Sequence, residues 1–165
     1  MILETRRLIL RNFIRADIPL YAAVCASKDA PPDPEERARG YIAAAACDPR
    51  LDFRMAVLDR RDGGLLGSAG IRLHGADSRT AMFSCEMARD HRQQGLGFEA
   101  AEAVIDMAFR ELSLENISAT TTTSNEAAVR LLYSLGMHPV SGTVSGSIGD
   151  TVMSLSRRDW FRQDS

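Results

Sequence analysis

The chain has 165 residues, of which 45% are hydrophobic and 25% charged, and these are ordinary values for one globular domain. Its formal net charge of −2 argues against nucleic acid as the main partner, because phosphate-binding proteins usually carry an excess of basic residues. The three cysteines are widely spaced and form no CxxC pair or Cys/His cluster, so we expect no metal site and no disulfide framework.

The cellular compartment is indicated by the N-terminal segment and by the lack of long apolar runs. Residues 1–11 alternate charged and hydrophobic side chains, unlike the apolar core of a signal peptide. No run of 18 apolar residues is present, so we expect no membrane-spanning helix and no membrane partner. The sequence therefore predicts a single cytoplasmic domain over residues 1–165, present as a monomer or homodimer.

The first third of the chain predicts one strand and two helices. A segment rich in Leu and Ile, residues 3–13, predicts the strand. Asp17 caps a short helix that ends near residue 26. Asp33 and Glu36 have the spacing of a capping box for a second helix, which ends near Cys47. The expected buried face of the first helix consists of Leu20, Ala23 and Val24.

The middle of the chain predicts three strands. Residues 53–59 and 65–72 form an expected hairpin, because the turn sequence Asp62-Gly63-Gly64 separates them. Residues 80–88 predict a third strand of the same central group. Six polar residues and two glycines then precede a strong amphipathic helix. Its apolar residues recur at helical spacing: Ala101, Val104, Ile105, Ala108, Phe109 and Leu112.

The last third predicts a strand, a short helix and a hairpin. Residues 116–122 are rich in β-branched side chains, and Asn125 caps a helix that ends at Gly136. Residues 137–143 and 148–155 form the expected hairpin around a Gly/Ser turn. The whole order predicts an α/β (α+β) fold, with one mixed, mostly antiparallel sheet of about seven strands and about four helices.

The most informative stretch is Arg92–Gly97, which lies between a predicted strand and the amphipathic helix. Glycines let the backbone turn tightly and approach a ligand closely. The free N–H groups of the first helical turn and the helix dipole then favour a phosphate group. The same pattern is also typical of a glycine-rich turn with a purely structural role, and the loop alone does not separate these two interpretations.

A dinucleotide site is the main competing interpretation of this loop. Residues 95–100 fit the pattern G-x-G-x-x-A, and Glu115 lies 20 residues beyond Gly95. In dinucleotide-binding folds, however, a strand runs directly into the first glycine within repeated βαβ units. Here polar residues intervene and antiparallel hairpins surround the loop. No G-x-x-x-x-G-K-[ST] pattern occurs, which excludes a P-loop nucleotide hydrolase at the level of motifs.

Four segments together resemble the GNAT superfamily of acetyltransferases. The loop is similar to its Q/R-x-x-G-x-G/A signature for acetyl-CoA, and residues 123–128 with 135–137 resemble its "N…A…LGF" segment. Residues 3–11, LETRRLILR, resemble the opening of the RimJ/RimL-like group, which acetylates protein N-termini and small amines. Residues 153–160, MSLSRRDW, resemble the closing segment of that group, so the resemblance covers nearly the whole chain.

The resemblance implies a sheet that is splayed between the strands at residues 80–88 and 116–122, the fourth and fifth strands of the family. The pantetheine arm of acetyl-CoA would lie in the gap, and the diphosphate would lie on the backbone of the loop. No metal is implied. The implied cofactor-binding residues are Cys85, Met87, Arg92, Gln93, Gln94, Gly95, Leu96, Gly97, Phe98, Asn125 and Ala128.

The resemblance also implies direct attack of an amine on the thioester, so the protein must supply an oxyanion donor and a route for the amine proton. The backbone N–H of Cys85 is the expected oxyanion donor. Glu86 is the expected base, since a carboxylate buried near a dry site has a raised pKa. A structural Glu86, exposed or paired with an Arg, is the competing interpretation.

Two departures from the RimJ/RimL-like pattern lie near the expected reaction centre. Ala128 stands where that group usually has Ser, and Ser84-Cys85-Glu86 stands where it usually has Gly-Tyr-Trp. Tyr133 is one residue away from the position of the general-acid Tyr found in many relatives, which falls here on Leu132. We therefore expect an acetyl-CoA-dependent N-acetyltransferase acting on a primary amine, or alternatively a non-catalytic acyl-CoA-binding domain.

Overall fold

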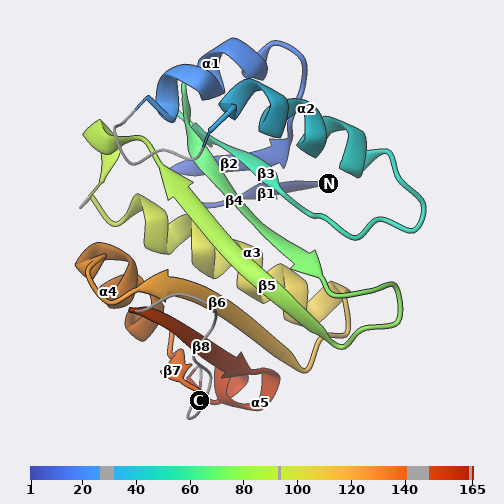
Figure 1. Cartoon of the computed structure of the whole chain (residues 1–165), viewed down its shortest axis with the longest axis vertical. Coiled ribbons are helices and arrows are strands. Elements are labelled where there is room, and N and C mark those ends of the chain that lie inside the picture. Colours follow the sequence, from blue (N-terminus) through green and yellow to red (C-terminus); the bar gives the residue numbers. More distant parts are fainter. Residues whose placement is uncertain (27–31, 93, 141–148, 164) are drawn as a thin grey trace.

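The computed structural model describes residues 1–26, 32–92, 94–140, 149–163 and 165, and these form one open sheet with helices on both faces (Figure 1). Within this part of the chain, eight strands have the order β1-β2-β3-β4-β5-β6-β8-β7. The strands are β1 (Ile2–Glu4), β2 (Leu8–Asn12), β3 (Met55–Asp59), β4 (Leu65–Leu73), β5 (Thr80–Met87), β6 (Asn116–Thr122), β7 (His138–Pro139) and β8 (Asp150–Ser156). The helices are α1 (Asp17–Val24), α2 (Pro34–Ala45), α3 (Leu96–Glu111), α4 (Glu126–Ser134) and α5 (Arg157–Arg162), with a single 3₁₀ turn at Arg89–His91.

The two faces of the sheet are separated by the period of two along its strands. In β3, Met55 and Val57 belong to the main core under α3. Their neighbours Ala56 and Leu58 point the other way, into a smaller cluster under α1 and α2. Helix α3 therefore covers one face, and α1 with α2 covers the other, as Figure 1 shows.

Helix α3 anchors the main core. Eight of its residues are buried, among them Val104, Ile105, Ala108 and Phe109, all of which the sequence placed on the apolar face. The helix begins directly after Gly95, whose φ of 76° is a left-handed conformation that glycine adopts without strain. The loop and the helix start predicted at this point are confirmed.

Strands β5 and β6 pair only over their first three residues. The parallel register joins Thr80 to Asn116 and Met82 to Ser118, and the pairing ends there. Figure 1 shows the two arrows diverging toward their C-terminal ends. Beyond residue 118, β6 continues to pair with β8 on its other side. The predicted splay of the sheet between these two strands is therefore confirmed.

The N-terminal predictions need two corrections. Residues 3–13 form two antiparallel strands, not one, because the chain turns between Glu4 and Leu8. The buried side of α1 carries Tyr21 and Asp17, whereas Leu20 is 52% exposed. The predicted face was wrong because it weighted aliphatic residues and ignored the hydroxyl of Tyr21, which finds partners inside the fold.

The capping prediction was correct in position for Asp33 but wrong for Asp17, because the N-cap of α1 is Ala16, and neither aspartate caps its helix through its side chain. Asp17 lies in the first turn of α1, and its carboxylate accepts a hydrogen bond from the Ile14 N–H and pairs with Arg11. Asp33 precedes α2 but makes no capping hydrogen bond through its side chain, so the expected capping box with Glu36 does not form. Both helices end slightly earlier than predicted.

The C-terminal hairpin is present with a very short first strand. Strand β7 pairs with β8 through His138 and Pro139, and the predicted turn lies outside the described residues. Helix α5 exceeds the predicted number of helices, because its six residues are too few to show a clear period. In the part of the chain that the structure describes, every helix is too short or too polar to cross a bilayer.

Candidate functional site

The loop before α3 presents an uncapped helix N-terminus. Gly95 provides no side-chain cap, so the first N–H groups of the helix have no partner within it. A Cβ atom at Gly97 would lie 3.7 Å from Cγ of Met87, which is an ordinary contact. Because packing does not require a glycine there, close approach of an outside group is the simplest physical reason for it. This geometry fits an anion.

The loop is held in place by Glu99, one turn into α3. Its carboxylate accepts hydrogen bonds from the Thr5 hydroxyl at 2.5 Å and from Nε of Arg7 at 2.6 Å. The backbone N–H of Arg7 adds a third bond at 2.7 Å, and Nη1 of Arg7 donates to the carbonyl of Gln94 at 2.9 Å. The turn between β1 and β2 is thereby fastened to the helix start.

This contact also affects the charge of Glu99. Burial alone would raise its pKa, but the hydrogen bonds from Thr5 and Arg7 outweigh burial and lower it. Glu99 therefore stays ionised, and Arg7 stays beside the loop with its side chain 38% exposed. Sequence reasoning missed this pair, although Arg7 lies inside a segment that carries the family resemblance.

The predicted cofactor-binding residues of the loop have different environments. Leu96 is 7% exposed and packs in the core, so only its backbone faces the helix terminus. Phe98 is 36% exposed, and Arg92 donates through Nε to the carbonyl of Met87 at 3.3 Å. Gln93 lies outside the described residues. The structure thus brings Arg92 and Met87 together beside the loop.

The second part of the site is the open end of the split between β5 and β6. Past Met82, β5 runs on through Cys85 to Met87 without β6 as a neighbour. Cys85 packs against the main core, and burial raises the pKa of its thiol to about 11. The thiol therefore stays protonated near neutral pH and is a poor nucleophile. Only its backbone is available for the role predicted for Cys85.

Glu86 points to the opposite face of the sheet, under α1 and α2. Its Oε2 accepts a hydrogen bond from the Tyr21 hydroxyl at 2.7 Å and pairs with Nη2 of Arg37 at 2.8 Å. The Tyr21 hydroxyl also lies 3.1 Å from Oγ of Ser68, which sits across the β4–β5 ladder from Glu86. Hydrogen bonds and an ion pair thus join side chains of β4, β5, α1 and α2 in one polar cluster around the Glu86 carboxylate.

The expected rise in the pKa of Glu86 is wrong. Burial does act to raise it, but the hydrogen bonds from Tyr21 and Arg37 and the charge of Arg37 together lower it. Burial raises the pKa of the Tyr21 phenol, so Tyr21 remains a hydrogen-bond donor to the carboxylate. Glu86 is thus a stable anion. Its role as the base stays a prediction.

A second arginine enters the same cluster from the residue before β3. Nη1 of Arg54 donates to Oγ of Ser68 and to the carbonyl of Ser84, both at 3.3 Å, and Nη2 contacts the Ser84 hydroxyl. Its guanidinium also stacks over the ring of Tyr41. Sequence reasoning found neither Arg54 nor Arg37, because nothing local marks these two among the 20 basic residues.

Helix α4 supplies the remaining predicted residues. Asn125 accepts a hydrogen bond from the N–H of Ala128 at 3.2 Å and is an N-cap, as the capping pattern predicted. Leu132 is 4% exposed and packs in the core, whereas Tyr133 is 52% exposed. The two neighbours therefore face different directions, as one step of helical rotation requires.

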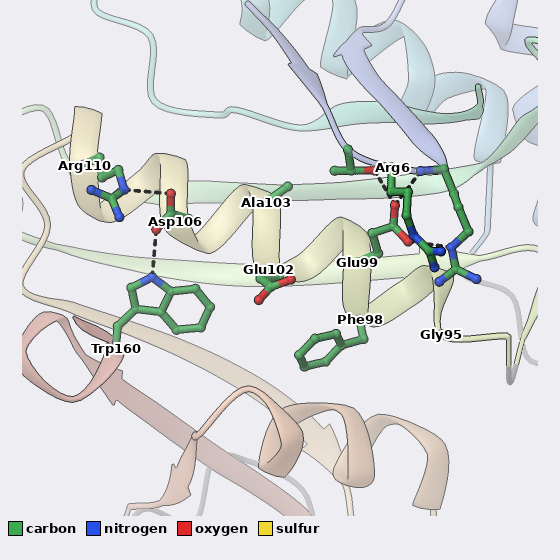
Figure 2. A pocket seen from close by; sticks show the side chains of 11 residues that line it. Arg6, Gly95, Phe98, Glu99, Glu102, Ala103, Asp106, Arg110 and Trp160 are labelled. Atoms are coloured by element: carbon green, nitrogen blue, oxygen red, sulfur yellow. Dashed lines mark hydrogen bonds and ion pairs between the residues drawn. The ribbon is translucent and has the colours of Figure 1, made fainter. Parts of the chain in front are cut away.

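A hollow of about 600 Å³ lies along the outer side of α3 (Figure 2). It runs from Gly95 and Phe98 past Glu102 to Asp106, which accepts a hydrogen bond from the Trp160 indole at 3.1 Å. No residue of β5 lines it, so it meets the expected site only at the loop. Within the described residues, no group of three His, Cys, Asp or Glu side chains is placed to hold a metal ion.

Comparisons with known proteins identify the family of this chain. Residues 7–138 match the family described as the acetyltransferase (GNAT) domain. The chain is 30% identical over 145 residues to the uncharacterized N-acetyltransferase YoaA of Bacillus subtilis, covering 82% of this chain and 81% of that protein.

Solved structures match the fold over nearly its whole length. The spermidine/spermine N-acetyltransferase SpeG of Vibrio cholerae matches with a TM-score of 0.79, at 17% identity, over 98% of this chain and all of its own. The ribosomal-protein-S5-alanine acetyltransferase of Vibrio fischeri matches with a TM-score of 0.77, at 16% identity, over 97% and 98%. These two neighbours do not single out the RimJ/RimL-like branch. The family match covers most of the chain, and the protein belongs to the GNAT acetyltransferase family.

Proposed function

We propose that this protein is an N-acetyltransferase that moves the acetyl group of acetyl-CoA to a primary amine of a small molecule, peptide or protein N-terminus. The observation that carries the proposal is the junction of an uncapped helix N-terminus with an opening between two strands. The helix N-terminus suits a diphosphate, and the opening between the strands suits the extended pantetheine arm with its amide groups. We propose that the protein acts in the cytoplasm, as a monomer or homodimer.

The donor would be held mainly by backbone groups. The N–H groups at residues 95–98 would bind the diphosphate, and Arg92 and Arg7 lie close enough to the loop to add positive charge. Asn125 and Ala128, at the start of α4, would face the arm from the other side of the opening. Gly97 supports this assignment, because its missing side chain leaves room beside Met87.

The chemistry would be a direct transfer. The amine nitrogen attacks the thioester carbonyl carbon, the C–N bond forms, and the C–S bond breaks. The backbone N–H of Cys85 would stabilise the oxyanion, and the amine proton would pass to Glu86 or to water while the departing thiolate takes a proton. The high pKa of the Cys85 thiol supports attack without a covalent enzyme intermediate.

A non-catalytic acyl-CoA-binding domain is the second candidate. It is favoured by the ion pair of Glu86 with Arg37, which lowers the basicity of the only carboxylate on β5. A thiol-release assay with acetyl-CoA over a panel of primary amines separates the two functions. Acetyl-CoA binding without thiol release from any amine would support the second candidate.

The donor site is tested by thermal unfolding with acetyl-CoA. At 100 times its dissociation constant a ligand adds ~2.7 kcal/mol to stability, so the melting temperature should rise. Gly95→Asp should abolish this rise, because it puts a side chain and a negative charge against the diphosphate.

Gly63→Asp is the matched control for this test. Gly63 has a φ of 74°, close to that of Gly95, and nothing lies within 4 Å of an added Cβ. The control therefore introduces the same charge and the same backbone strain in the exposed turn before β4. If Gly95→Asp keeps the full rise in melting temperature, the loop is not the donor site.

A further inference from the structure

Resting on the proposed function, we infer that the acetyl acceptor is a small amine that also carries an anionic oxygen group, a carboxylate or a phosphonate, which Arg54 and Arg37 bind. An amino acid or an aminophosphonate is the kind of molecule that meets this description. The assignment follows from the polar cluster under α1 and α2, which consists of Tyr21, Arg37, Arg54, Ser68, Ser84 and Glu86.

The charges of this cluster do not balance. Arg37 pairs with Glu86, and this pair is neutral. The guanidinium of Arg54 donates to Ser68 and Ser84, and among the described residues it meets no carboxylate. Counted over the described residues, one positive charge is therefore left over at a place where side chains are largely withdrawn from water, and such a charge is costly without a counter-ion.

The hydrogen-bond donors do not balance either. Nη1 of Arg37 and Nε of Arg54 are both buried, and neither has a partner in the described part of the chain. A guanidinium has five N–H donors and no acceptor, so each of these atoms needs an acceptor that the described residues do not supply. Buried polar groups without partners are rare in folded proteins, and two in one cluster fit a site that receives an anion.

Both guanidiniums are held rigidly for such a ligand. Arg37 lies over the ring of Tyr21, and Arg54 lies over the ring of Tyr41, at 5.6 and 5.2 Å from the ring centroids. Hydrogen bonds then link Arg54 to Ser68, Ser68 to Tyr21 and Tyr21 to Arg37. A planar, preorganised guanidinium is well suited to bind carboxylate and phosphonate oxygens.

The position of the cluster suits an acceptor. Ser84 and Glu86 belong to the part of β5 beyond Met82, where β6 has separated from it. An anion on these arginines would thus lie on the α1–α2 side of the strand whose backbone is proposed to hold the thioester. The positive charge of Arg54, which Glu86 does not neutralise, would repel a second ammonium group, so a polyamine should be a poor acceptor.

The test compares acceptors that each carry a primary amine and that differ in the charge of the other group. L-Alanine and 1-aminoethylphosphonate carry the anion, L-alaninamide is their neutral counterpart, and spermidine carries further positive charge. Thiol release from acetyl-CoA gives kcat/KM for each compound. We expect either anionic compound to exceed alaninamide and spermidine by at least about tenfold, the ratio expected for one charge-assisted contact.

Variants of Arg54 test whether this side chain causes the preference for anionic over neutral acceptors. Arg54→Met should reduce the ratio of anionic to neutral kcat/KM about tenfold or more, and Arg54→Lys, which keeps the charge and loses the fork, should reduce it less. Arg39→Met is the matched control, because Arg39 lies on the same helix as Arg37 but is 53% exposed and pairs with Glu35. The control should leave the ratio unchanged.

A binding measurement keeps the result independent of turnover. In the presence of CoA, calorimetric titration with N-acetyl-alanine should show tighter binding than titration with N-acetyl-alaninamide, and Arg54→Met should remove the difference. Equal binding and equal turnover of the two matched compounds, or a preference for spermidine, would overturn the inference while leaving the proposed function intact. Failure of acetyl-CoA to raise the melting temperature would count against the proposed function itself.

Discussion

The proposed donor side and the proposed acceptor side of the site are built in different ways. On the donor side, the loop before α3 offers backbone N–H groups, and side chains such as Glu99 only hold the backbone in place. On the acceptor side, the groups on offer are side chains, which come from α1, α2, β4, β5 and the residue before β3. One side depends on a local conformation, and the other depends on the assembled fold.

This difference suggests how the two sides can vary. A backbone site needs only a few glycines and a helix start, so one short sequence pattern can serve many proteins with the same donor. A side-chain cluster changes its charge with every substitution among residues that are far apart in the chain. We therefore expect the donor side to be general within the fold and the acceptor side to be particular to this chain.

The largest effect is expected on the acceptor side, at Glu86. If Glu86 takes the amine proton, directly or through water, Glu86→Gln should lower kcat by ~10²–10⁴-fold while CoA affinity changes little. The acidic limb of the pH–rate profile should disappear in the variant. In the wild type this limb should lie below the ordinary range for a Glu carboxyl, because Tyr21 and Arg37 lower its pKa.

The stability of the protein gives an independent measurement at the same residue. The folded-state pKa of Glu86 is lowered, so its contribution to folding is present above the unfolded pKa and is lost as the pH falls through the folded value. Glu86→Gln should flatten the melting temperature over this acidic range. Glu36→Gln, at a 79% exposed side chain of α2, is the control. A fall in kcat of less than threefold would leave Glu86 structural and water as the base.

A smaller effect is expected on the donor side, at Glu99. Glu99→Gln removes the acceptor for Nε of Arg7 and loosens the turn that fixes the loop. The dissociation constant of acetyl-CoA should rise about tenfold, equivalent to ~1.4 kcal/mol. Calorimetric titration measures it, with Glu102→Gln, an exposed residue on the same helix, as the matched control. An unchanged affinity would show that the loop holds its shape without this contact.

The smallest effect is expected at Tyr133, which belongs to neither side. The residue is 52% exposed, whereas Leu132 occupies the inward-facing position. Tyr133→Phe should therefore keep at least a third of the wild-type kcat, measured by thiol release. A hundredfold loss with CoA still bound would mean that the Tyr133 hydroxyl reaches the sulfur and that the helical register argument is wrong.

Regular elements with a strong local signal were predictable. The Asp62-Gly63-Gly64 turn fixed the β3–β4 hairpin, and the apolar period fixed α3 within one turn. The β1–β2 turn was not predictable, because the residues that stabilise it include Glu99, more than 90 positions away. The buried face of α1 was missed because Tyr21 is turned inward by hydrogen bonds to Ser68 and Glu86, not by its own helix.

The loop of the proposed donor site was predictable from sequence, but the cluster of the proposed acceptor site was not. Gly95 directly before α3 has a left-handed backbone conformation that the local sequence determines. Glu86 was noticed, yet the direction of its pKa depended on Arg37, which approaches from a different helix. Charge partners brought together by tertiary packing leave no pattern along the chain, and this is why the predicted rise in pKa was wrong.

The strand order has a consequence for how the chain can be synthesised and folded. Strand β6 shares three residue pairs with β5 but seven with β8, and among the described strands β7 pairs only with β8. Strands β6 and β7 can therefore form most of their residue pairs only after β8 (Asp150–Ser156) has left the ribosome. We expect residues 1–111 to fold around α3 during synthesis. The last third of the chain should then fold onto them in one late, cooperative step.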